Sequence, residues 1–260
     1  MTKSPEAAAR RETRRAAHIF TVGFLVLWAI YGQIVEPYIM PGPASVAVRL
    51  YEFFTDFHLV KHMFWSFTHI GGAIVASFVI GGGLAMLPFY LPSFGLMVYG
   101  RLTPFLNSFS GIGWTLLAIM WFGINHFTVM FAISMVLIPF SVINIREGLD
   151  AIDREMLEMG RSFGRARWRQ FRLLVLPALY PFIFATVRIS FGVAWKVALT
   201  AELFGGATGL GYLLNLARQD FDMPMILVVI IVIILFVYST DRWVFAPIQS
   251  RLARHHAVPG

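Results

Sequence analysis

The sequence predicts an all-α membrane protein with about six transmembrane helices. Of its 260 residues, 58% are hydrophobic and only 13% are charged, whereas soluble domains carry roughly 25% charged residues. The charges are also unevenly placed: no Asp, Glu, Lys or Arg lies between Lys61 and Arg101, between Arg101 and Arg146, or between Asp222 and Asp241. A spanning helix needs about 20 mostly apolar residues, and the uncharged stretches provide that length.

Six spans are predicted from these stretches, at residues 18–36, 64–91, 99–122, 126–146, 178–200 and 223–244. The apolar run of the first span is longer than the core of a cleaved signal peptide, so we expect it to be retained. The stretch between Arg101 and Arg146 is long enough for two spans, joined by a tight turn at residues 123–126.

The third span is the least regular of the six. Its pattern is interrupted by proline, glycine and small polar residues, namely Pro104, Asn107, Ser108, Ser110, Gly111 and Gly113. Such interruptions are tolerated at membrane depth where the backbone is buried in protein or lines a cavity. A break here therefore points to a segment that lines a polar path.

The basic residues predict the orientation. If the N-terminus lies in the cytoplasm, sixteen of the 21 Lys and Arg residues fall on the cytoplasmic side, three outside, and Arg188 and Lys196 within a span. Cytoplasmic loops carry such an excess of basic residues, so we expect both termini in the cytoplasm. The net charge of +7 then reflects inner loops that face anionic lipid rather than nucleic acid.

The longest charged stretch, residues 147–172, separates the fourth and fifth spans. Asp153 can cap a short helix from Arg154 to about Ser162 by accepting backbone N–H bonds, and Gly164 suits the turn that follows. A second helix then runs toward Pro177, with Trp168, Phe171 and Val175 at the spacing of one helical face. The residues alone predict a cytoplasmic helix–turn–helix.

This segment resembles a motif of the permease subunits of bacterial ATP-binding-cassette (ABC) importers. That motif reads Glu-Ala-Ala, three residues, Gly, nine residues, Ile, one residue and Leu-Pro, and this chain keeps every spacing with Glu158-Met159-Gly160, Gly164, Leu174 and Leu176-Pro177. It departs from the motif at Met159, Gly160 and Leu174. Four further segments resemble the permeases of nitrate, sulfonate, taurine and bicarbonate importers: residues 40–43, 121–123, 201–202 and 209–212.

The resemblance implies the type I importer permease fold, in a multi-pass protein of the bacterial cytoplasmic membrane. It also implies a second copy of the chain, two ATPase subunits and an extracytoplasmic solute-binding protein as partners, besides membrane lipids. The short cytoplasmic helix would fit a groove on the ATPase, with contacts from Glu158, Met159, Gly160, Gly164, Leu176 and Pro177. No phosphate-binding loop occurs in the sequence, so the chain is expected to bind no cofactor and not to be an enzyme, with ATP and Mg on the ATPase subunit.

The domain organisation expected from this resemblance has four parts. Residues 1–17 form a cytoplasmic basic tail, and residues 18–62 form the first span with an external loop. Residues 63–245 form the permease core, which includes the coupling segment 147–176, and residues 246–260 form a second cytoplasmic tail.

Several polar residues within spans are candidates for the substrate path. Asn107, Ser110 and Trp114 could line it, or they could instead satisfy broken backbone and pack against other helices. Arg188, Lys196 and Glu202 are further candidates for this path. Arg188 and Lys196 are charges inside a span, and such residues are functional hypotheses by default. Arg188 could alternatively snorkel or pair with another helix, and Lys196 could pair with Glu202 near the outer end or anchor the helix at the interface.

The histidines give no support for a metal site. His58 and His62 have the i, i+4 spacing of two ligands, but no third ligand completes a set. His69 lies in an apolar span, where a hydrogen-bonded packing role is expected. The chain also has no cysteine.

The resemblance implies a permease that forms the path for a small solute in an ATP-driven importer. Its relatives imply that this solute is a small anion such as a sulfonate, nitrate or an organic acid, or a thiamine-precursor pyrimidine. A stand-alone secondary transporter or channel is the alternative function. That class would predict an inverted repeat with paired broken helices. No such repeat is found in the sequence, and the cytoplasmic motif would be left unexplained.

Overall fold

The computed structural model describes residues 5–36, 39–153, 155 and 167–250. Every regular element among these residues is a helix, which confirms the predicted all-α class. The chain divides into two compact units, the first made of Met1–Val60 and Leu214–Ile231 and the second of Lys61–Leu213 and Val232–Gly260.

Within the described residues, four helices are long and apolar enough to cross a membrane: Phe57–Tyr90, His126–Asp150, Trp168–Gly205 and Met223–Ser250. They coincide with the second, fourth, fifth and sixth predicted spans. The bent pair Pro92–Ser108 and Gly111–Phe122 gives a fifth crossing if it is one span, and His18–Ile34 is a shorter apolar helix. All six predicted segments therefore fall on helices.

The first unit holds α1 (Pro5–Ile34), α2 (Pro43–Thr55) and the turn between α10 (Leu210–Gln219) and α11 (Met223–Thr240). Trp28 Nε1 donates to the carbonyl of Pro41 at 3.0 Å and so fixes the connection from α1 to α2. Arg49 of α2 donates to Asp222 at 2.6 Å, and Asp222 also accepts from the backbone N–H of Met225 in the first turn of α11.

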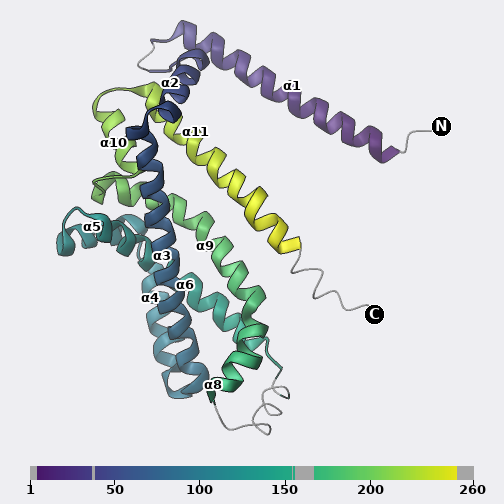
Figure 1. The fold of residues 1–260 in the computed structure, drawn as a ribbon, viewed down its shortest axis with the longest axis vertical. Coiled ribbons are helices and arrows are strands. Elements are labelled where there is room, and N and C mark those ends of the chain that lie inside the picture. Colours follow the sequence, from purple (N-terminus) through teal and green to yellow (C-terminus); the bar gives the residue numbers. More distant parts are fainter. Residues whose placement is uncertain (1–4, 37–38, 154, 156–166, 251–260) are drawn as a thin grey trace. The chain divides into compact units, whose positions relative to one another are not determined.

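The second unit is built around α6 (His126–Asp150) and α9 (Leu176–Gly205), which pack along each other (Figure 1). α3 (Phe57–Tyr90) approaches α6 closely at Gly81, where an added Cβ would lie 2.6 Å from the Cβ of Ser141. Close backbone approach through small residues is a common way for membrane helices to pack.

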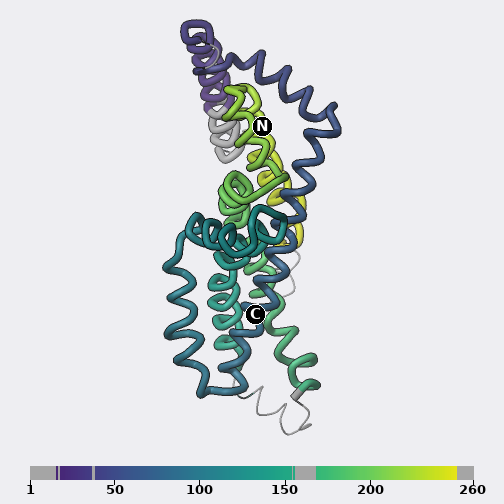
Figure 2. The backbone as a smooth tube through the Cα atoms, turned by 90° about the vertical axis from the view of Figure 1, so that its left-hand side faces the viewer, coloured from purple at the N-terminus to yellow at the C-terminus, as the bar shows by residue number. Residues whose placement is uncertain are grey.

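The third predicted span, residues 99–122, is broken at the small polar residues that interrupt its pattern. A helical run from Pro92 through α4 (Thr103–Ser108) is followed by α5 (Gly111–Phe122) at an angle of 87° (Figure 2). Phe109 and Ser110 have extended backbone between the two helices, and the Ser110 side chain accepts from the backbone N–H of Gly113. The predicted break at the small polar residues is therefore confirmed.

Each of the three π-helical segments in the described part of the chain lies just before a proline. They are η2 (Leu96–Leu102), η3 (Phe171–Val175) and η4 (Asp241–Phe245), and Pro104, Pro177 and Pro247 follow them. A proline in a helix removes one hydrogen bond and its ring clashes with the carbonyl four residues earlier. A widened π turn accommodates that clash and lets the helix continue.

The tight turn predicted at residues 123–126 is confirmed. Gly123 ends α5 with a φ of +71°, a conformation that glycine adopts without strain. Asn125 then caps α6 by accepting from the backbone N–H of Thr128 at 3.0 Å.

Candidate functional site

Most of the predicted coupling segment lies outside the described residues, including Glu158, Met159, Gly160 and Gly164. Its beginning is described: Asp153 Oδ1 accepts from the backbone N–H of Glu155 at 3.0 Å, the bond expected of a helix cap. The roles assigned to this segment stay predictions.

The second helix of this segment runs to Pro177, as predicted, and continues beyond it into the fifth span. α8 (Arg167–Gln170), η3 and α9 form one apolar helical run that ends at Gly205. Leu176 and Pro177 are thus inside the helix that forms the fifth span, because the π turn before Pro177 absorbs the missing hydrogen bond.

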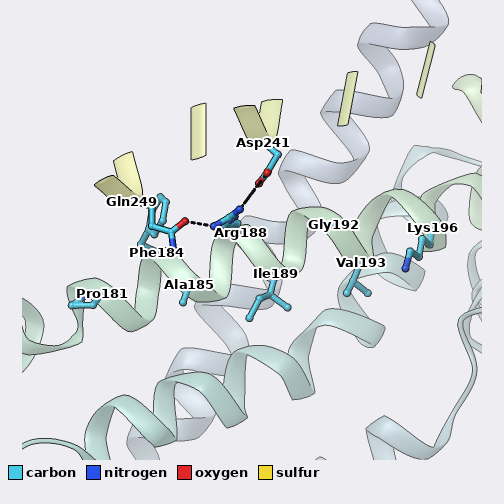
Figure 3. Close-up of a pocket in the computed structure, with 10 residues that line it drawn as sticks. All are labelled: Pro181, Phe184, Ala185, Arg188, Ile189, Gly192, Val193, Lys196, Asp241 and Gln249. Carbon is cyan, nitrogen blue, oxygen red and sulfur yellow. Dashed lines mark hydrogen bonds and ion pairs between the residues drawn. The ribbon is translucent and has the colours of Figure 1, made fainter. Parts of the chain in front are cut away.

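Arg188 and Lys196 line the same cavity, of about 860 Å³, between α9 and the helical segment 241–250 (Figure 3). They lie eight residues apart, which places them roughly on one face of α9 and about 12 Å apart along it. Gly192 lies between them, and no side chain fills the space beside it. This volume is in the range of cavities that hold small ligands.

The two basic side chains differ in their partners. Arg188 donates to Asp241 at 2.9 Å through Nε and at 3.2 Å through Nη2. It also donates to Gln249. The charge of Arg188 is thus paired with that of Asp241 on another helical segment, which is one of the two alternatives to a role in cargo binding. Lys196 is exposed to the cavity and has no ion-pair partner among the described side chains. Lys196 is therefore the available cation in this cavity.

The hypothesised ion pair between Lys196 and Glu202 is wrong. Residues six apart on an α-helix are rotated by about 240° around its axis, so the two side chains leave α9 on different faces. Lys196 faces the cavity, whereas Glu202 is 1% exposed and pairs with His69 at 2.8 Å.

Glu202 is the centre of a buried polar cluster. Its carboxylate accepts from the hydroxyl of Ser66 at 2.8 Å, from His69 Nδ1 at 2.8 Å and from the backbone N–H of Gly211 at 2.9 Å. The second ring nitrogen of His69 lies 2.9 Å from Nδ1 of His126. The hydrogen-bonded packing role predicted for His69 is confirmed, but Ser66 and His126 were missed because helical spacing does not reveal contacts between distant helices.

The Glu202 cluster explains the two glycines, Gly209 and Gly211, in the segment 209–212 that resembles importer permeases. Gly209 has a φ of +111°, and a Cβ there would lie 2.2 Å from the carboxyl carbon of Glu202. A Cβ on Gly211 would lie 2.4 Å from the carbonyl oxygen of Leu199. Only glycine lets this backbone come so close to α9.

The candidates on the broken third span do not line the cavity of Arg188 and Lys196. Ser110 caps α5, which favours its backbone role, and Trp114 is buried against Phe109 and Phe131. Asn107 lines a separate hollow of about 440 Å³ that Arg146 also borders. Whether any of the three contacts cargo stays a prediction.

No group of three His, Asp or Glu side chains in the described ranges is arranged to hold a metal ion. His62, which lies four residues after His58, accepts from the backbone N–H of Gly209 at 3.2 Å and lies against the ring of Tyr212.

The fold is similar to that of a known transporter chain. A solved chain of the MetNI methionine ABC transporter, in an inward-facing conformation, matches with a TM-score of 0.59 at 16% identity. The match covers 71% of this chain and 93% of the solved one. This likeness shows that the chain shares the fold of that transporter chain.

Sequence comparison identifies the family. Its relatives include SsuC of Bacillus subtilis, whose name assigns it to aliphatic sulfonates transport, at 25% identity over 84% of this chain and 82% of SsuC. CmpB of Synechococcus elongatus, a bicarbonate transport system permease protein, is 26% identical over 86% of each chain. The sequence profile described as "Binding-protein-dependent transport system inner membrane component" matches residues 77–247, more than half of the chain. The chain therefore belongs to the family of inner membrane components of binding-protein-dependent transport systems.

Proposed function

We propose that this chain forms the membrane path of an ATP-driven importer for a small anion, as one of two identical permease subunits. The family match over residues 77–247 is the observation that carries the proposal. Symmetric pairing is the commonest arrangement of identical subunits, and a chain of about six spans would supply half of a symmetric path.

The partners follow from the family. Two ATPase subunits bind ATP and Mg on the cytoplasmic side, and a solute-binding protein delivers the cargo on the other side. The chain has no phosphate-binding loop, so its part is to bind and pass the solute, while the ATPase supplies the energy. Both termini lie in the cytoplasm in this arrangement.

An anionic cargo is supported by the cavity beside α9. A cation at membrane depth is costly unless an opposite charge compensates it. Arg188 has that compensation from Asp241, whereas Lys196 faces the cavity without it. A small anion such as a sulfonate, nitrate, bicarbonate or an organic acid would supply the missing charge, and the names of SsuC and CmpB refer to anions of this kind.

The coupling segment links ATP hydrolysis in the ATPase subunits to the movement of solute through this chain. Closure of the ATPase pair on ATP would move the helix that the sequence predicts after Asp153, and this rigid-body motion would reach the spans. The fifth span is continuous with α8, so a displacement near Arg167 would be carried directly into the helix that bears Arg188 and Lys196.

Reconstitution tests the proposal. The chain alone in proteoliposomes is expected neither to hydrolyse ATP nor to take up methanesulfonate, nitrate or bicarbonate along an ion gradient. Together with its ATPase, it is expected to hydrolyse ATP faster when loaded binding protein is added, and to accumulate one of these anions but not glucose. Gradient-driven uptake by the lone chain would contradict the proposal and support the secondary transporter instead.

A further inference from the structure

The buried cluster around Glu202 lies at one end of the helical core of the second unit. α6 begins there at His126, directly after the 123–125 turn, and α9 ends there at Gly205. The predicted coupling segment lies at the opposite ends of these two helices, between Asp150 and Arg167. In the proposed orientation, the cluster is therefore at the outer end, where a binding protein arrives.

The cluster holds the segment 206–211 by its backbone. Three successive N–H groups at the start of α10 each meet a side chain: Gly209 donates to His62, Leu210 to Ser66 and Gly211 to Glu202. The first N–H groups of a helix have no partner within it, and the positive end of the helix dipole favours the carboxylate there. This end of α10 is thus tied to both α3 and α9.

The hydrogen bonds extend from the carboxylate to α6. His69 Nδ1 lies 2.8 Å from Glu202 Oε1, within hydrogen-bond distance. His69 Nε2 lies 2.9 Å from His126 Nδ1, and one proton between them completes the chain. The His126 ring also stacks on Trp65 with centroids 4.1 Å apart. Glu202, His69 and His126 thereby join α9, α3 and the start of α6.

We propose that Glu202 and His69 are positioning residues that clamp the segment 206–211 to the spans and transmit a displacement of that segment to them. This inference rests on the proposed function, which brings the binding protein to this end of the molecule. A buried carboxylate persists only while its hydrogen bonds are made. Pulling the segment away would break its three hydrogen bonds to His62, Ser66 and Glu202 and would take one of the three donors from the buried carboxylate, so the segment, α3 and α9 move together.

A surface loop without such a clamp would absorb the displacement by changing its own backbone angles. The clamp removes this freedom, because three backbone N–H groups would have to leave their side-chain acceptors at once. Glu202 therefore acts through the position of the segment rather than by touching cargo. It does not line the cavity of Arg188 and Lys196.

The absence of cysteine from the chain allows the clamp to be measured directly. Ala207 is exposed within the segment, so Ala207→Cys gives a single labelling site for a nitroxide. In the assembled transporter we expect Glu202→Gln, which keeps the shape but removes the charge, to increase the mobility of this label. We also expect it to reduce the stimulation of ATP hydrolysis by loaded binding protein at least about fivefold. Glu202→Asp, which keeps the charge, should recover part of both effects.

Thr200→Ala is the matched control, because Thr200 lies on the same helix as Glu202 and its hydroxyl donates to the backbone carbonyl of Lys196 in that helix. If Glu202→Gln does not assemble, Ser66→Ala removes one of the three donors and should shift both readouts in the same direction. A more mobile label with unchanged stimulation of ATP hydrolysis would overturn the proposal, and Glu202 would then only cap the start of α10. An unchanged label would also overturn it. Failure of the unmodified transporter to respond to binding protein would instead overturn the proposed function.

Discussion

At the scale of single residues, Lys196 and Arg188 share a cavity but differ in what surrounds them. Arg188 is paired with Asp241, and Lys196 has no ionic partner in the part of the chain that is described. We expect Lys196→Gln to lower anion uptake about tenfold, because a hydrogen bond to a charged group contributes about 1.5–3 kcal/mol. Lys196→Arg should retain most uptake. Uptake per assembled complex in proteoliposomes is the measurement, and normal transport by Lys196→Gln would remove this residue from the path.

Gly209 is a second residue whose role can be tested singly. Alanine there would combine a φ of +111° with a contact of 2.2 Å to the Glu202 carboxyl carbon. We expect Gly209→Ala to destabilise the chain by about 2 kcal/mol or more, measured as a lower unfolding temperature in detergent. Gly71→Ala is the control, since Gly71 is helical with open space around it. Equal unfolding temperatures for the two variants would contradict the structure.

At the scale of elements, the break between α4 and α5 depends on a cap. Ser110 accepts from the backbone N–H of Gly113, and loss of a serine cap costs about 1 kcal/mol. Ser110→Ala should therefore lower the unfolding temperature, whereas Ser108→Ala should have little effect because Ser108 bonds only within the turn it ends. A similar response of both variants would show that the cap does not maintain the bend.

The coupling segment is the element for which the family resemblance predicts a specific role, contact with the ATPase. A large side chain at Gly164 would obstruct the turn or the close approach to the ATPase. We expect Gly164→Leu to reach the membrane at normal levels but to lose co-purification with the ATPase, or uptake, or both. Normal assembly together with normal uptake would show that the motif spacing in this chain is coincidental.

At the scale of the whole molecule, the distribution of basic residues predicts the topology. Reporters fused after residue 40 or 215 should lie outside the cell, and those after residue 150 or 255 inside, because basic loops are retained in the cytoplasm. Protease or enzyme reporters in intact cells measure this. An external position for residue 150 would remove the coupling segment from the ATPase and end the permease interpretation.

The fold was predictable from sequence to the extent that local composition decides it. Uncharged stretches located the spans, Gly123 and Asn125 marked a turn, and small polar residues marked the break in the third span. The second cytoplasmic helix was predicted to run toward Pro177, but its continuation into the fifth span was not predicted, because a proline normally breaks a helix. Sequence does not show that a π turn absorbs it, since this depends on neighbouring helices that stabilise the distorted turn.

The candidate site was predictable only in part. Arg188, Lys196 and Glu202 stood out as polar groups at membrane depth, which is itself costly and therefore informative. Their partners could not be read from spacing. Asp241 lies 53 residues from Arg188, and His69 lies 133 residues from Glu202, so both pairings depend on how the helices pack.

The sequence by itself determined the class of the molecule, a helical membrane permease, since hydropathy, charge placement and family resemblance are properties of the chain alone. Only the tertiary structure decided which charges are neutralised and which remain available. Two charges on one helix, Arg188 and Lys196, look equivalent in sequence, but one meets Asp241 and the other faces an open cavity. The physical reason is that electrostatic compensation acts over a few ångströms in space, and only the packing of distant segments brings compensating groups within that range.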